Sequence, residues 1–458
     1  MNSKEIYQNI NLIKIVNEIN VDIQNVVTDS RLVKPASLYI AIKGDNFDGN
    51  NYYQNAFENG ASIAIVDNVN ITSEVENYLK ENNKSLIIVE DSVKALGQLA
   101  KYKRSKFNGT VVAITGSAGK TSTKDMVYSV LSSHYNAFKT FGNHNNHLGL
   151  PLTILAMPDD TEILVVEMGM NHLGEISYLT DIARPDIAII TNVGTAHIGN
   201  LGSRENILKA KLEILEGLNE NGHFIINNDN DLLHSWYESD ESKNYKVKTF
   251  AIINQSEYMA QNIVYENEKS SFIYNDEKIK VPIGGEHFIY NALAALTAGE
   301  IFNIPLEKIK KGILNFSLSQ NRMNIINNNG LTIIDDSYNA NFDSLKYALK
   351  FLGTFPERKI AVIGTMLELG KYSQKLHTEL GNFVVSENID ILITVGNDTE
   401  FINQKALELG FDENNQYHFT NNLDAINLID SISKKDDVIL IKASNGLKFK
   451  EIVEHLSK

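Results

Sequence analysis

The chain has no cysteine, which excludes disulfide bonds and thiolate chemistry and allows a reducing compartment. It also has no apolar run near the ~18 residues that a membrane-spanning helix needs, so we expect no membrane span. The first residues, from Met1 to Tyr7, lack the pattern of a signal peptide. These absences together predict a cytoplasmic location.

Basic residues are in deficit. The 42 lysines and arginines are outnumbered by 57 aspartates and glutamates, which gives a net charge of −15. No long basic run offsets this excess, and nucleic-acid backbones are bound by clustered positive charge. We therefore predict no nucleic-acid partner. A nucleotide is still allowed, because a local loop can bind phosphate inside an acidic protein.

Short apolar strands alternate with helical stretches along nearly the whole chain. This pattern predicts an α/β fold with parallel sheets, and 458 residues are too many for one hydrophobic core. We predict three domains, at residues 1–106, 107–318 and 319–458. A helix over 92–106 is expected to close the first domain, and the third suits a doubly wound sheet.

The strands are predicted where β-branched and apolar residues form short runs. These runs are 37–42, 61–66 and 85–89 in the first domain, 110–115, 163–166, 187–190 and 223–226 in the second, and 331–334, 359–363, 389–395 and 438–441 in the third. Residues 246–282 are more polar and alternate, which predicts a small antiparallel edge. A helix over about 287–302 is expected to follow it.

The most informative segment is a glycine turn between a predicted strand and a predicted helix. Thr110–Thr115 is followed by Gly116-Ser-Ala-Gly-Lys-Thr121 and then by a helical stretch from Thr123 to about Ser133. Glycines let backbone N–H groups turn toward an anion, and the helix N-terminus adds its dipole. In a phosphate-binding loop of this kind, Lys120 contacts the outer phosphates and Thr121 contacts Mg²⁺.

The match to a phosphate-binding loop is imperfect. The full pattern has its first glycine earlier than Gly116, so the loop here is shorter than the common form. A glycine-rich turn with an incidental lysine is the alternative interpretation, and this segment alone leaves both open.

Polar residues follow two other strands of the second domain. Glu167 ends the apolar run that starts at Ile163, and His197 follows the run that ends at Ile190. Open α/β sheets bind ligands at such strand ends, and Mg²⁺ prefers hard oxygen ligands. A solvated acid and a structural histidine are the alternatives. Lys209 and Lys211 lie on the next predicted helix, and spacing alone does not distinguish them.

Three further clusters could take part in binding. Gly142-Asn-His-Asn-Asn146 is dense in amides that could recognise a polar substrate, although Asn and Gly also favour ordinary turns. His287 and Asn291 are four residues apart, hence on one helix face. Arg322 and Asp336 bracket the first strand of the third domain, and an arginine there could stabilise phosphate charge. Each cluster alone could equally be a surface feature.

Taken together, these segments resemble the Mur ligases, the ATP-dependent amide-forming enzymes of peptidoglycan precursor synthesis. The pattern is most similar to the members that add D-alanyl-D-alanine. The resemblance covers nearly the whole chain and rests on the following motifs: Thr28-Asp-Ser-Arg31, Leu38 to Gly44, Thr115 to Ser122, Thr140 to Thr153, Glu167 to Ile176, Asp336 to Asn341 and Met366-Leu-Glu-Leu-Gly370. The short phosphate loop is the form that this family uses.

The resemblance implies a fold and a reaction. The first domain would bind a uridine nucleotide, the second would be a P-loop ATPase-like parallel sheet, and the third would be Rossmann-like. ATP would phosphorylate the terminal carboxylate of UDP-N-acetylmuramoyl-tripeptide, and the amine of D-alanyl-D-alanine would attack the resulting acyl phosphate. The resemblance also implies a monomer. It leaves open whether the tripeptide ends in lysine or diaminopimelate.

The resemblance also assigns site residues. ATP would be bound by Gly116, Ser117, Ala118, Gly119, Lys120, Thr121, Ser122, His287, Asn291, Arg322 and Asp336. Two Mg²⁺ ions would be held by Thr121, Glu167, His197 and Lys211. Substrates would contact Ser30, Arg31, Asn143, Asn145 and Asn146. The catalytic residues would be Lys120, His197, Lys211 and Arg322.

The implied lysine ligand is a lysine carbamate, formed with CO₂, which turns a cation into a carboxylate-like group. The family match points to Lys211, with Lys209 as the fallback. Some positions depart from the family pattern: Thr365, Phe342 and Asn445 replace the usual Asp, Pro and Arg, and Asn50 replaces His. The loss of an arginine at Asn445 puts in doubt how the third domain meets its ligands.

Three rival functions remain. The ligase that adds the third residue of the peptide is disfavoured by the Asn-rich motif at 140–153 and by Met366 to Gly370. A folylpolyglutamate-type ligase would leave the first domain unexplained. A non-catalytic nucleotide-binding protein is disfavoured because Lys120, Glu167 and His197 are intact.

Overall fold

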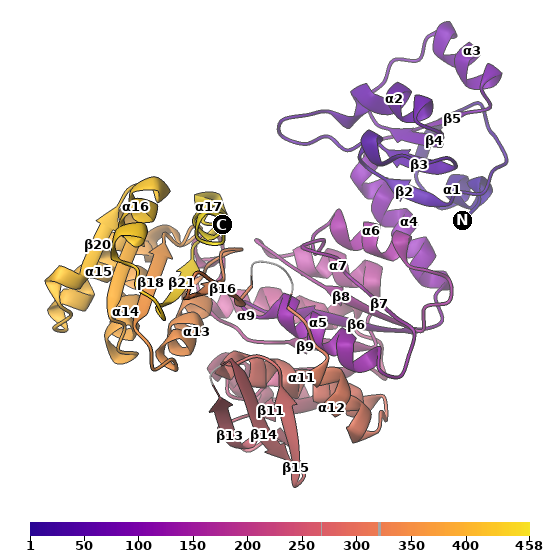
Figure 1. The fold of residues 1–458 in the computed structure, drawn as a ribbon. Helices are drawn as coiled ribbons and strands as arrows, with labels where there is room; N and C mark the ends of the chain where they lie inside the picture. Colours follow the sequence, from indigo (N-terminus) through magenta and orange to yellow (C-terminus); the bar gives the residue numbers. More distant parts are fainter. Residues whose placement is uncertain (267, 319–321) are drawn as a thin grey trace.

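The computed structural model describes residues 1–266, 268–318 and 322–458. Three domains, each built around its own sheet, follow one another along the chain (Figure 1). This architecture confirms the predicted α/β class. The predicted boundary between residues 318 and 319 falls where the described residues stop, so it stays a prediction.

The N-terminal domain has a five-stranded sheet in the order β1-β5-β4-β3-β2, in which only β1 is antiparallel to its neighbour. Its strands are β1 Leu12–Val16, β2 Asn25–Val27, β3 Ser37–Ile40, β4 Ala61–Val66 and β5 Ser85–Val89, and its helices are α1 Ser3–Gln8, α2 Tyr53–Glu58 and α3 Ser73–Glu81. The predicted helix at 92–106 is α4 Ser92–Lys106, whose N-terminus is capped by the Asp91 carboxylate.

The central domain has a seven-stranded parallel sheet in the order β12-β11-β10-β9-β6-β8-β7. Its strands are β6 Thr110–Thr115, β7 Ala137–Lys139, β8 Ile163–Glu167, β9 Ile187–Ile190, β10 His223–Asn227, β11 Lys246–Ala251 and β12 Tyr258–Met259. Its helices are α5 Lys120–Leu131, α6 Gly149–Ala156, α7 Glu175–Ala183, α8 Ile198–Leu201, α9 Arg204–Leu212, α10 Asp231–Tyr237, α11 Glu286–Ile301 and α12 Leu306–Leu314.

Strand order places the ligand edge of this sheet. β6 lies between β8 and β9, and the chain winds outward from it in both directions. The carboxyl ends of β6, β8 and β9 therefore meet at a topological switch point, where open α/β sheets bind ligands. The glycine turn after β6, Glu167 at the end of β8 and the loop after β9 all lie at this edge.

The antiparallel edge predicted for 246–282 is only partly right. β13 Gln261–Glu266, β14 Lys269–Tyr274 and β15 Glu277–Val281 do form a separate antiparallel sheet, below α11 in Figure 1. β11, however, continues the central sheet in parallel to β10. Its first residues are partly exposed, because it lies near the sheet edge, and this gives it the alternating composition of an antiparallel strand.

The C-terminal domain has a six-stranded sheet in the order β16-β17-β21-β18-β19-β20, with only β16 antiparallel. Its strands are β16 Asn324–Asn328, β17 Leu331–Asp335, β18 Lys359–Gly364, β19 Ile391–Val395, β20 Gln416–Phe419 and β21 Val438–Lys442. Its helices are α13 Phe342–Gly353, α14 Ser373–Ser386, α15 Glu400–Glu408, α16 Asn422–Ile432 and α17 Lys450–Leu456. Because neighbours such as Ile333 and Ile334 are buried in different cores, both faces of the sheet are covered, as in a doubly wound fold.

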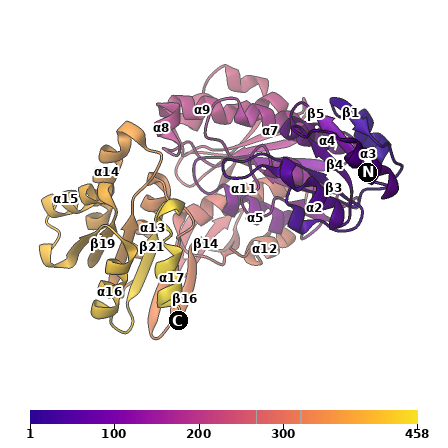
Figure 2. The same ribbon diagram turned by 90° about the horizontal axis from the view of Figure 1, so that it is seen from above.

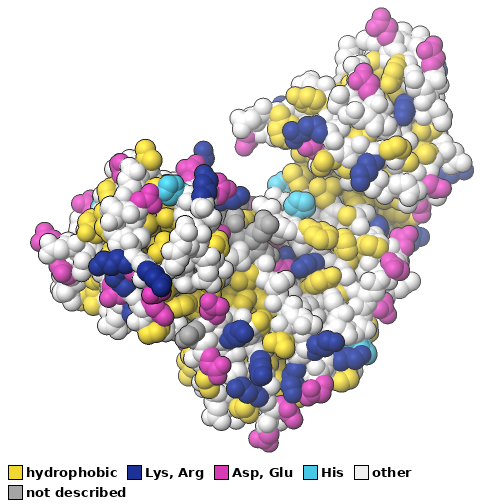
Figure 3. Space-filling view, viewed as in Figure 1, with side chains coloured by type: hydrophobic (Ala, Val, Ile, Leu, Met, Phe, Trp, Pro, Cys, Tyr) yellow, Lys and Arg dark blue, Asp and Glu magenta, His cyan; other side chains and the backbone are white. Residues whose placement is uncertain are grey.

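The central domain connects the other two. α4 packs on α6 and α7, and η5, the short helix Gly370–Tyr372, packs on α8. The N-terminal and C-terminal domains stand apart across a notch in the space-filling view (Figure 3), and the view from above shows both beside the central domain (Figure 2). Of the helices within the described ranges, none is long and apolar enough to cross a membrane.

Candidate active site

A cavity of about 460 Å³ lies between the central and C-terminal domains. Most of the predicted site residues line it: Ser117, Ala118, Gly119, Lys120, Thr121, Ser122, Asn143, Asn145, Asn146, Glu167, His197, His287, Asn291, Arg322 and Asp336. Gly116 and Lys211 are not among the lining residues, and Ser30 and Arg31 lie in the N-terminal domain. The structure thus brings the predicted ATP, metal and amide-rich segments together from two domains.

The glycine turn forms a tight loop ahead of α5. Gly119 has a left-handed φ of 79° and directly precedes the helix, which begins at Lys120 and so earlier than predicted. Gly116 has a φ of 154°, and a Cβ there would lie 1.8 Å from Oγ1 of Thr191. Both positions therefore require glycine, and the chain turns tightly between the end of β6 and the start of α5.

Lys120 folds back over this loop. Its Nζ donates a hydrogen bond of 2.8 Å to the carbonyl oxygen of Gly116. Burial lowers the pKa of Lys120; the nearby Glu167 carboxylate opposes this shift, and the Arg322 guanidinium adds to it. A phosphate group in the cavity would add negative charge beside this half-buried cation.

Glu167 is held by the amide-rich loop. Its Oε1 accepts a 2.7 Å hydrogen bond from Nδ2 of Asn145, and its backbone N–H donates to Oγ1 of Thr140 at 3.1 Å. Lys124, buried one turn after Lys120, donates to the Thr140 carbonyl at 2.9 Å and lies 4.0 Å from Oε2 of Glu167. That Oε2 atom is buried and has no hydrogen-bond partner among the described residues, which suits a cation ligand.

The two lysines that the sequence could not distinguish lie in different environments. Lys211 is buried at 1% exposure, whereas Lys209 on the same helix is exposed. Burial, and secondarily the positive charge of Lys120, lowers the pKa of Lys211 well below its usual value. Only a neutral amine reacts with CO₂, so these surroundings favour Lys211 as the site of a carbamate.

His197 follows β9 and lies near both buried lysines. Burial is the largest cause of its lowered pKa; the charges of Lys120 and Lys211 lower it further, and Glu368 opposes them. Its Nδ1 lies 2.7 Å from Oε2 of Glu368 in the C-terminal domain. The neutral imidazole is the form that binds metal ions.

His287 and Asn291 form an apolar-backed part of the wall on α11. The Nδ1 of His287 and the Nδ2 of Asn291 are both buried without a hydrogen-bond partner in the described structure. Burial and the charge of Lys442 lower the pKa of His287 to about 3, so it is neutral at pH 7. Two unpaired polar atoms on one helix face suit a flat polar ligand such as a nucleobase.

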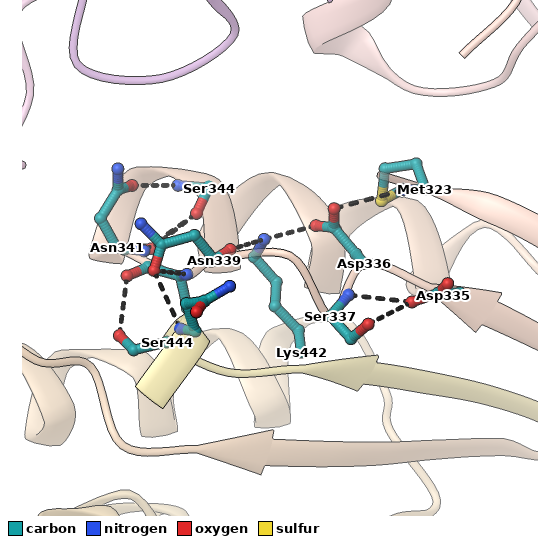
Figure 4. Close-up of polar contacts among 11 residues, drawn as sticks. Met323, Asp335, Asp336, Ser337, Asn339, Asn341, Ser344, Lys442 and Ser444 are labelled. Carbon is teal, nitrogen blue, oxygen red and sulfur yellow. Dashed lines mark hydrogen bonds and ion pairs between the residues drawn. The ribbon is translucent and has the colours of Figure 1, made fainter. Parts of the chain in front are cut away.

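The C-terminal wall is a connected polar network (Figure 4). Lys442 ends β21, and its Nζ lies 2.5 Å from Oδ2 of Asp336 and donates to the Asn339 carbonyl at 2.9 Å. The other Asp336 oxygen accepts from the backbone N–H of Met323 at 3.2 Å. Beside it, the Arg322 guanidinium lies 4.2 Å from the ring centroid of Tyr338, a cation–π contact that fixes its direction.

The predicted substrate residues divide into two places. Asn145 is committed to Glu167, and Oδ1 of Asn146 accepts from the N–H groups at the start of α6, at 2.9 Å from Gly149. Arg31 lies outside the cavity, on η1 (Ser30–Leu32), with its guanidinium paired to Asp29 at 2.7 Å. Ser30, which precedes it, is buried and accepts from Asn59 through its carbonyl.

The described residues offer no ready-made cluster of carboxylates and imidazoles for a metal ion. No group of three or more His, Cys, Asp or Glu side chains that could hold a metal ion occurs within residues 1–266, 268–318 and 322–458. The donors at hand are mixed: the Thr121 hydroxyl, Glu167 and His197, with buried Lys211 beside them. This set fits Mg²⁺, which completes its shell with phosphate oxygens and waters.

Sequence reasoning missed several residues that shape the cavity. Lys124 follows Lys120 by four residues on α5, and this spacing could have suggested a shared helix face. Asn192 holds the glycine loop by accepting from the Ala118 N–H at 2.9 Å. Glu368 lay within a quoted motif and Lys442 follows a predicted strand. Neither received a role, because their partners lie 171 and 106 residues away.

Family models match three consecutive parts of the chain. They are the Mur ligase family catalytic domain over residues 22–104, the Mur ligase middle domain over 114–299, and the Mur ligase glutamate ligase domain over 321–445. Together they cover most of the three domains.

Individual proteins give the same result. The UDP-N-acetylmuramoyl-tripeptide–D-alanyl-D-alanine ligase of Bacillus subtilis is 38% identical over 439 residues, which is 95% of this chain and 93% of that protein. The MurF structure from Acinetobacter baumannii has a TM-score of 0.89 at 28% identity, covering 99% of this chain and 98% of that one. The MurF ligase of Thermotoga maritima, solved in complex with ADP, has a TM-score of 0.82 at 28% identity and covers 95% and 97%.

Proposed function

The chain belongs to the Mur ligase family, and on this premise we propose that it joins D-alanyl-D-alanine to UDP-N-acetylmuramoyl-tripeptide with hydrolysis of ATP to ADP and phosphate. The observation that carries this proposal is the single cavity in which the glycine loop, the amide-rich loop and the C-terminal network meet. A nucleotide and an acyl acceptor can be held side by side only in such a place. The product is a precursor of peptidoglycan, made in the cytoplasm.

The reaction has two steps. A carboxylate oxygen of the tripeptide attacks the γ-phosphorus of ATP, the bond to ADP breaks, and an acyl phosphate forms. The amine of D-alanyl-D-alanine then attacks the acyl carbon, gives up a proton, and the tetrahedral intermediate expels inorganic phosphate. Alignment and charge neutralisation provide most of the catalysis in such transfers.

The residues of the central wall bind the nucleotide. The glycine loop from Gly116 to Thr121 and the Lys120 ammonium would face the phosphates, and His287 and Asn291 would flank the adenine. From the other wall, Arg322 reaches the phosphates, while Asp336 orients the Lys442 ammonium at 2.5 Å. Because the two walls belong to different domains, ATP is fully enclosed only when these domains are docked.

The donor set suits two Mg²⁺ ions. Thr121 and Glu167 would hold one ion, and His197 and carbamylated Lys211 would hold the second. When bound, Mg²⁺ would neutralise phosphate charge and align the reacting oxygens. Two observations support this division of roles: Oε2 of Glu167 has no hydrogen-bond partner among the described residues, and burial lowers the pKa of Lys211.

The tripeptide substrate would extend from the cavity to the N-terminal domain. Asn143, Asn145 and Asn146 would line its peptide, and Ser30 and Arg31 would contact its uridine nucleotide. The Arg31 side chain is exposed, and its ion pair with Asp29 lies at the protein surface. A diphosphate group would therefore have access to the Arg31 guanidinium. We propose a monomer, with the domains divided at residues 106 and 318.

Phosphate release tests the proposal directly. The purified protein is incubated with ATP, Mg²⁺ and UDP-N-acetylmuramoyl-tripeptide, with and without D-alanyl-D-alanine, and free phosphate is measured. We expect release that depends on the dipeptide and a product whose mass is increased by the dipeptide. Release that is unchanged by the dipeptide, or none with lysine-ended and diaminopimelate-ended tripeptides, would contradict the assignment.

A further inference from the structure

A residue of the C-terminal domain contacts His197 directly. Glu368 lies in the loop after β18, and its Oε2 atom is 2.7 Å from Nδ1 of His197, which follows β9 of the central domain. Both side chains line the same cavity. The His197 side chain is mostly buried, at 22% exposure, so its ring has few other directions available.

This contact selects a tautomer. A carboxylate only accepts hydrogen bonds, so Nδ1 of His197 must carry the proton. In the neutral ring the other nitrogen, Nε2, is then left with its lone pair. Metal-binding histidines are commonly fixed in this way by a carboxylate on the second ring nitrogen.

The backbone around the contact is built for close approach. His197 and Glu368 both have left-handed φ angles, of 62° and 66°, which are unfavourable for residues with side chains. The N–H of Gly199 donates to the Glu368 carbonyl at 3.1 Å, and a Cβ at Gly199 would lie 2.4 Å from that oxygen. Strain of this kind persists only where the surrounding structure holds it, and it concentrates at functional sites.

A second contact joins the same two loops without touching His197. The Tyr372 hydroxyl donates to the Gly202 carbonyl at 2.5 Å, and both residues lie a few positions beyond the Glu368–His197 pair. Tyr372 does not line the cavity. A variant of Tyr372 therefore tests domain docking alone, whereas a variant of Glu368 tests docking and the contact with His197 together.

We propose that Glu368 is a positioning residue: the C-terminal domain supplies it to hold His197 with Nε2 free toward the metal and phosphate site. The metal-binding set of the central domain is then complete only while the C-terminal domain is docked. This inference rests on the proposed function, because it concerns the ligand geometry of the same site. In this proposal, the Met366 to Gly370 motif provides the carboxylate that orients His197.

The test compares three variants with the wild type. Glu368→Ala removes the acceptor, Glu368→Gln keeps an acceptor without the charge, and Tyr372→Phe removes only the neighbouring contact. For Glu368→Ala we expect kcat/KM in phosphate release to fall about 10–100-fold, the usual range for partners of metal-binding histidines. Glu368→Gln should recover part of this loss, and Tyr372→Phe should stay close to wild type.

A second readout does not depend on turnover. In the protein without ligands, ¹⁵N NMR of labelled histidine reports the tautomer, and His197→Asn identifies the signal among the 11 histidines. We expect the Nδ1–H form in wild type and Tyr372→Phe, and a shift toward the Nε2–H form in Glu368→Ala. Binding of Mn²⁺ alone, followed by electron paramagnetic resonance, should weaken about 10-fold or more in Glu368→Ala.

An unchanged tautomer in Glu368→Ala would overturn the proposal, and so would equal losses in Glu368→Ala and Tyr372→Phe, which would indicate docking alone. Failure of the proposed function is distinguishable, because wild type would then show no dipeptide-dependent phosphate release. The tautomer and Mn²⁺ results would still decide the role of Glu368.

Discussion

The two walls of the cavity differ in how their buried polar atoms are hydrogen-bonded. On the central wall, Oε2 of Glu167, Nδ1 of His287 and Nδ2 of Asn291 are buried without a hydrogen-bond partner among the residues that the structure describes. On the C-terminal wall, Lys442, Asp336 and Asn339 bond to one another, and among the described residues of that wall no buried side-chain atom is left unpaired. The central wall thus keeps its polar atoms for ligands, whereas the C-terminal wall is a self-sufficient network that presents charge.

The largest effect should come from the loop of the central wall. Lys120→Ala removes the buried ammonium that faces the phosphates, and we expect phosphate release to fall by at least about 10²–10³-fold. Stability should change little, because the Lys120 ammonium has one hydrogen bond among the described residues, to the Gly116 carbonyl. Lys101→Ala, on the exposed face of α4, removes a surface ion pair with Asp181 and is a matched control expected to keep wild-type turnover. Near-normal activity of Lys120→Ala would refute the assignment of the loop.

Loss of Lys211, unlike loss of Lys120, should be partly reversed by an added carboxylate. Lys211→Ala is expected to lose about 10²-fold in turnover, since it removes a charge-bearing group from the metal site. A short carboxylate such as acetate should restore part of it, because it can replace a carbamate but not an ammonium. Lys209→Ala, on the exposed side of α9, should be unaffected by either. If Lys209→Ala were the impaired and rescued variant, the assignment would move to Lys209.

Substitutions in the C-terminal wall should mainly lower the free energy of unfolding. The side chains of Lys442 and Asp336 are only 3% and 12% exposed. Lys442→Ala therefore leaves a largely buried carboxylate without its ionic partner, although the Met323 N–H still donates to it. We expect the domain to lose about 3 kcal/mol, measured by urea unfolding. Lys450→Ala breaks an exposed ion pair with Glu454 in the same domain and should cost well under about 1 kcal/mol. Equal losses of unfolding free energy in Lys442→Ala and Lys450→Ala would show that the Lys442–Asp336 pair adds no more stability than an exposed ion pair.

The central wall was largely predictable from the sequence, and the comparison of the walls explains why. Its functional groups follow strand ends or glycine turns, and such positions are fixed by local composition and by the rules of parallel sheets. The amino-acid pattern alone therefore sufficed to place Gly116, Glu167 and His197 at one edge of the sheet. Burial then separated Lys211 from Lys209, which spacing could not do.

The C-terminal wall was not predictable in the same way. The Lys442–Asp336 pair joins residues 106 positions apart, and the contact of Glu368 with His197 depends on docking of two domains. The sequence also misjudged β11, because partly exposed edge strands and antiparallel strands share one alternating pattern. Local patterns predict elements and strand ends, but they do not register which side chains meet across a domain interface.

The pKa of His287 depends on both walls of the cavity. The pH dependence of stability that it causes is the smallest of the expected effects. It lies on the central wall, yet the Lys442 charge adds to burial in lowering its pKa to about 3, from the 6.5 of an unfolded chain. Above pH 6.5 the ring is neutral in both states and adds nothing. Between pH 6.5 and 3 only the unfolded chain takes up the proton, so folding stability falls as the pH is lowered.

From pH 7 to 5 the histidine should cost about 2 kcal/mol of unfolding free energy. His287→Phe removes the titrating ring nitrogens while keeping an aromatic ring of similar size beside Phe288. Urea unfolding at both pH values should therefore show a smaller loss in His287→Phe than in wild type. Lys442→Met should lie between them, because it removes the secondary cause and leaves burial. Identical pH dependence in all three proteins would mean that neither wall influences this ring.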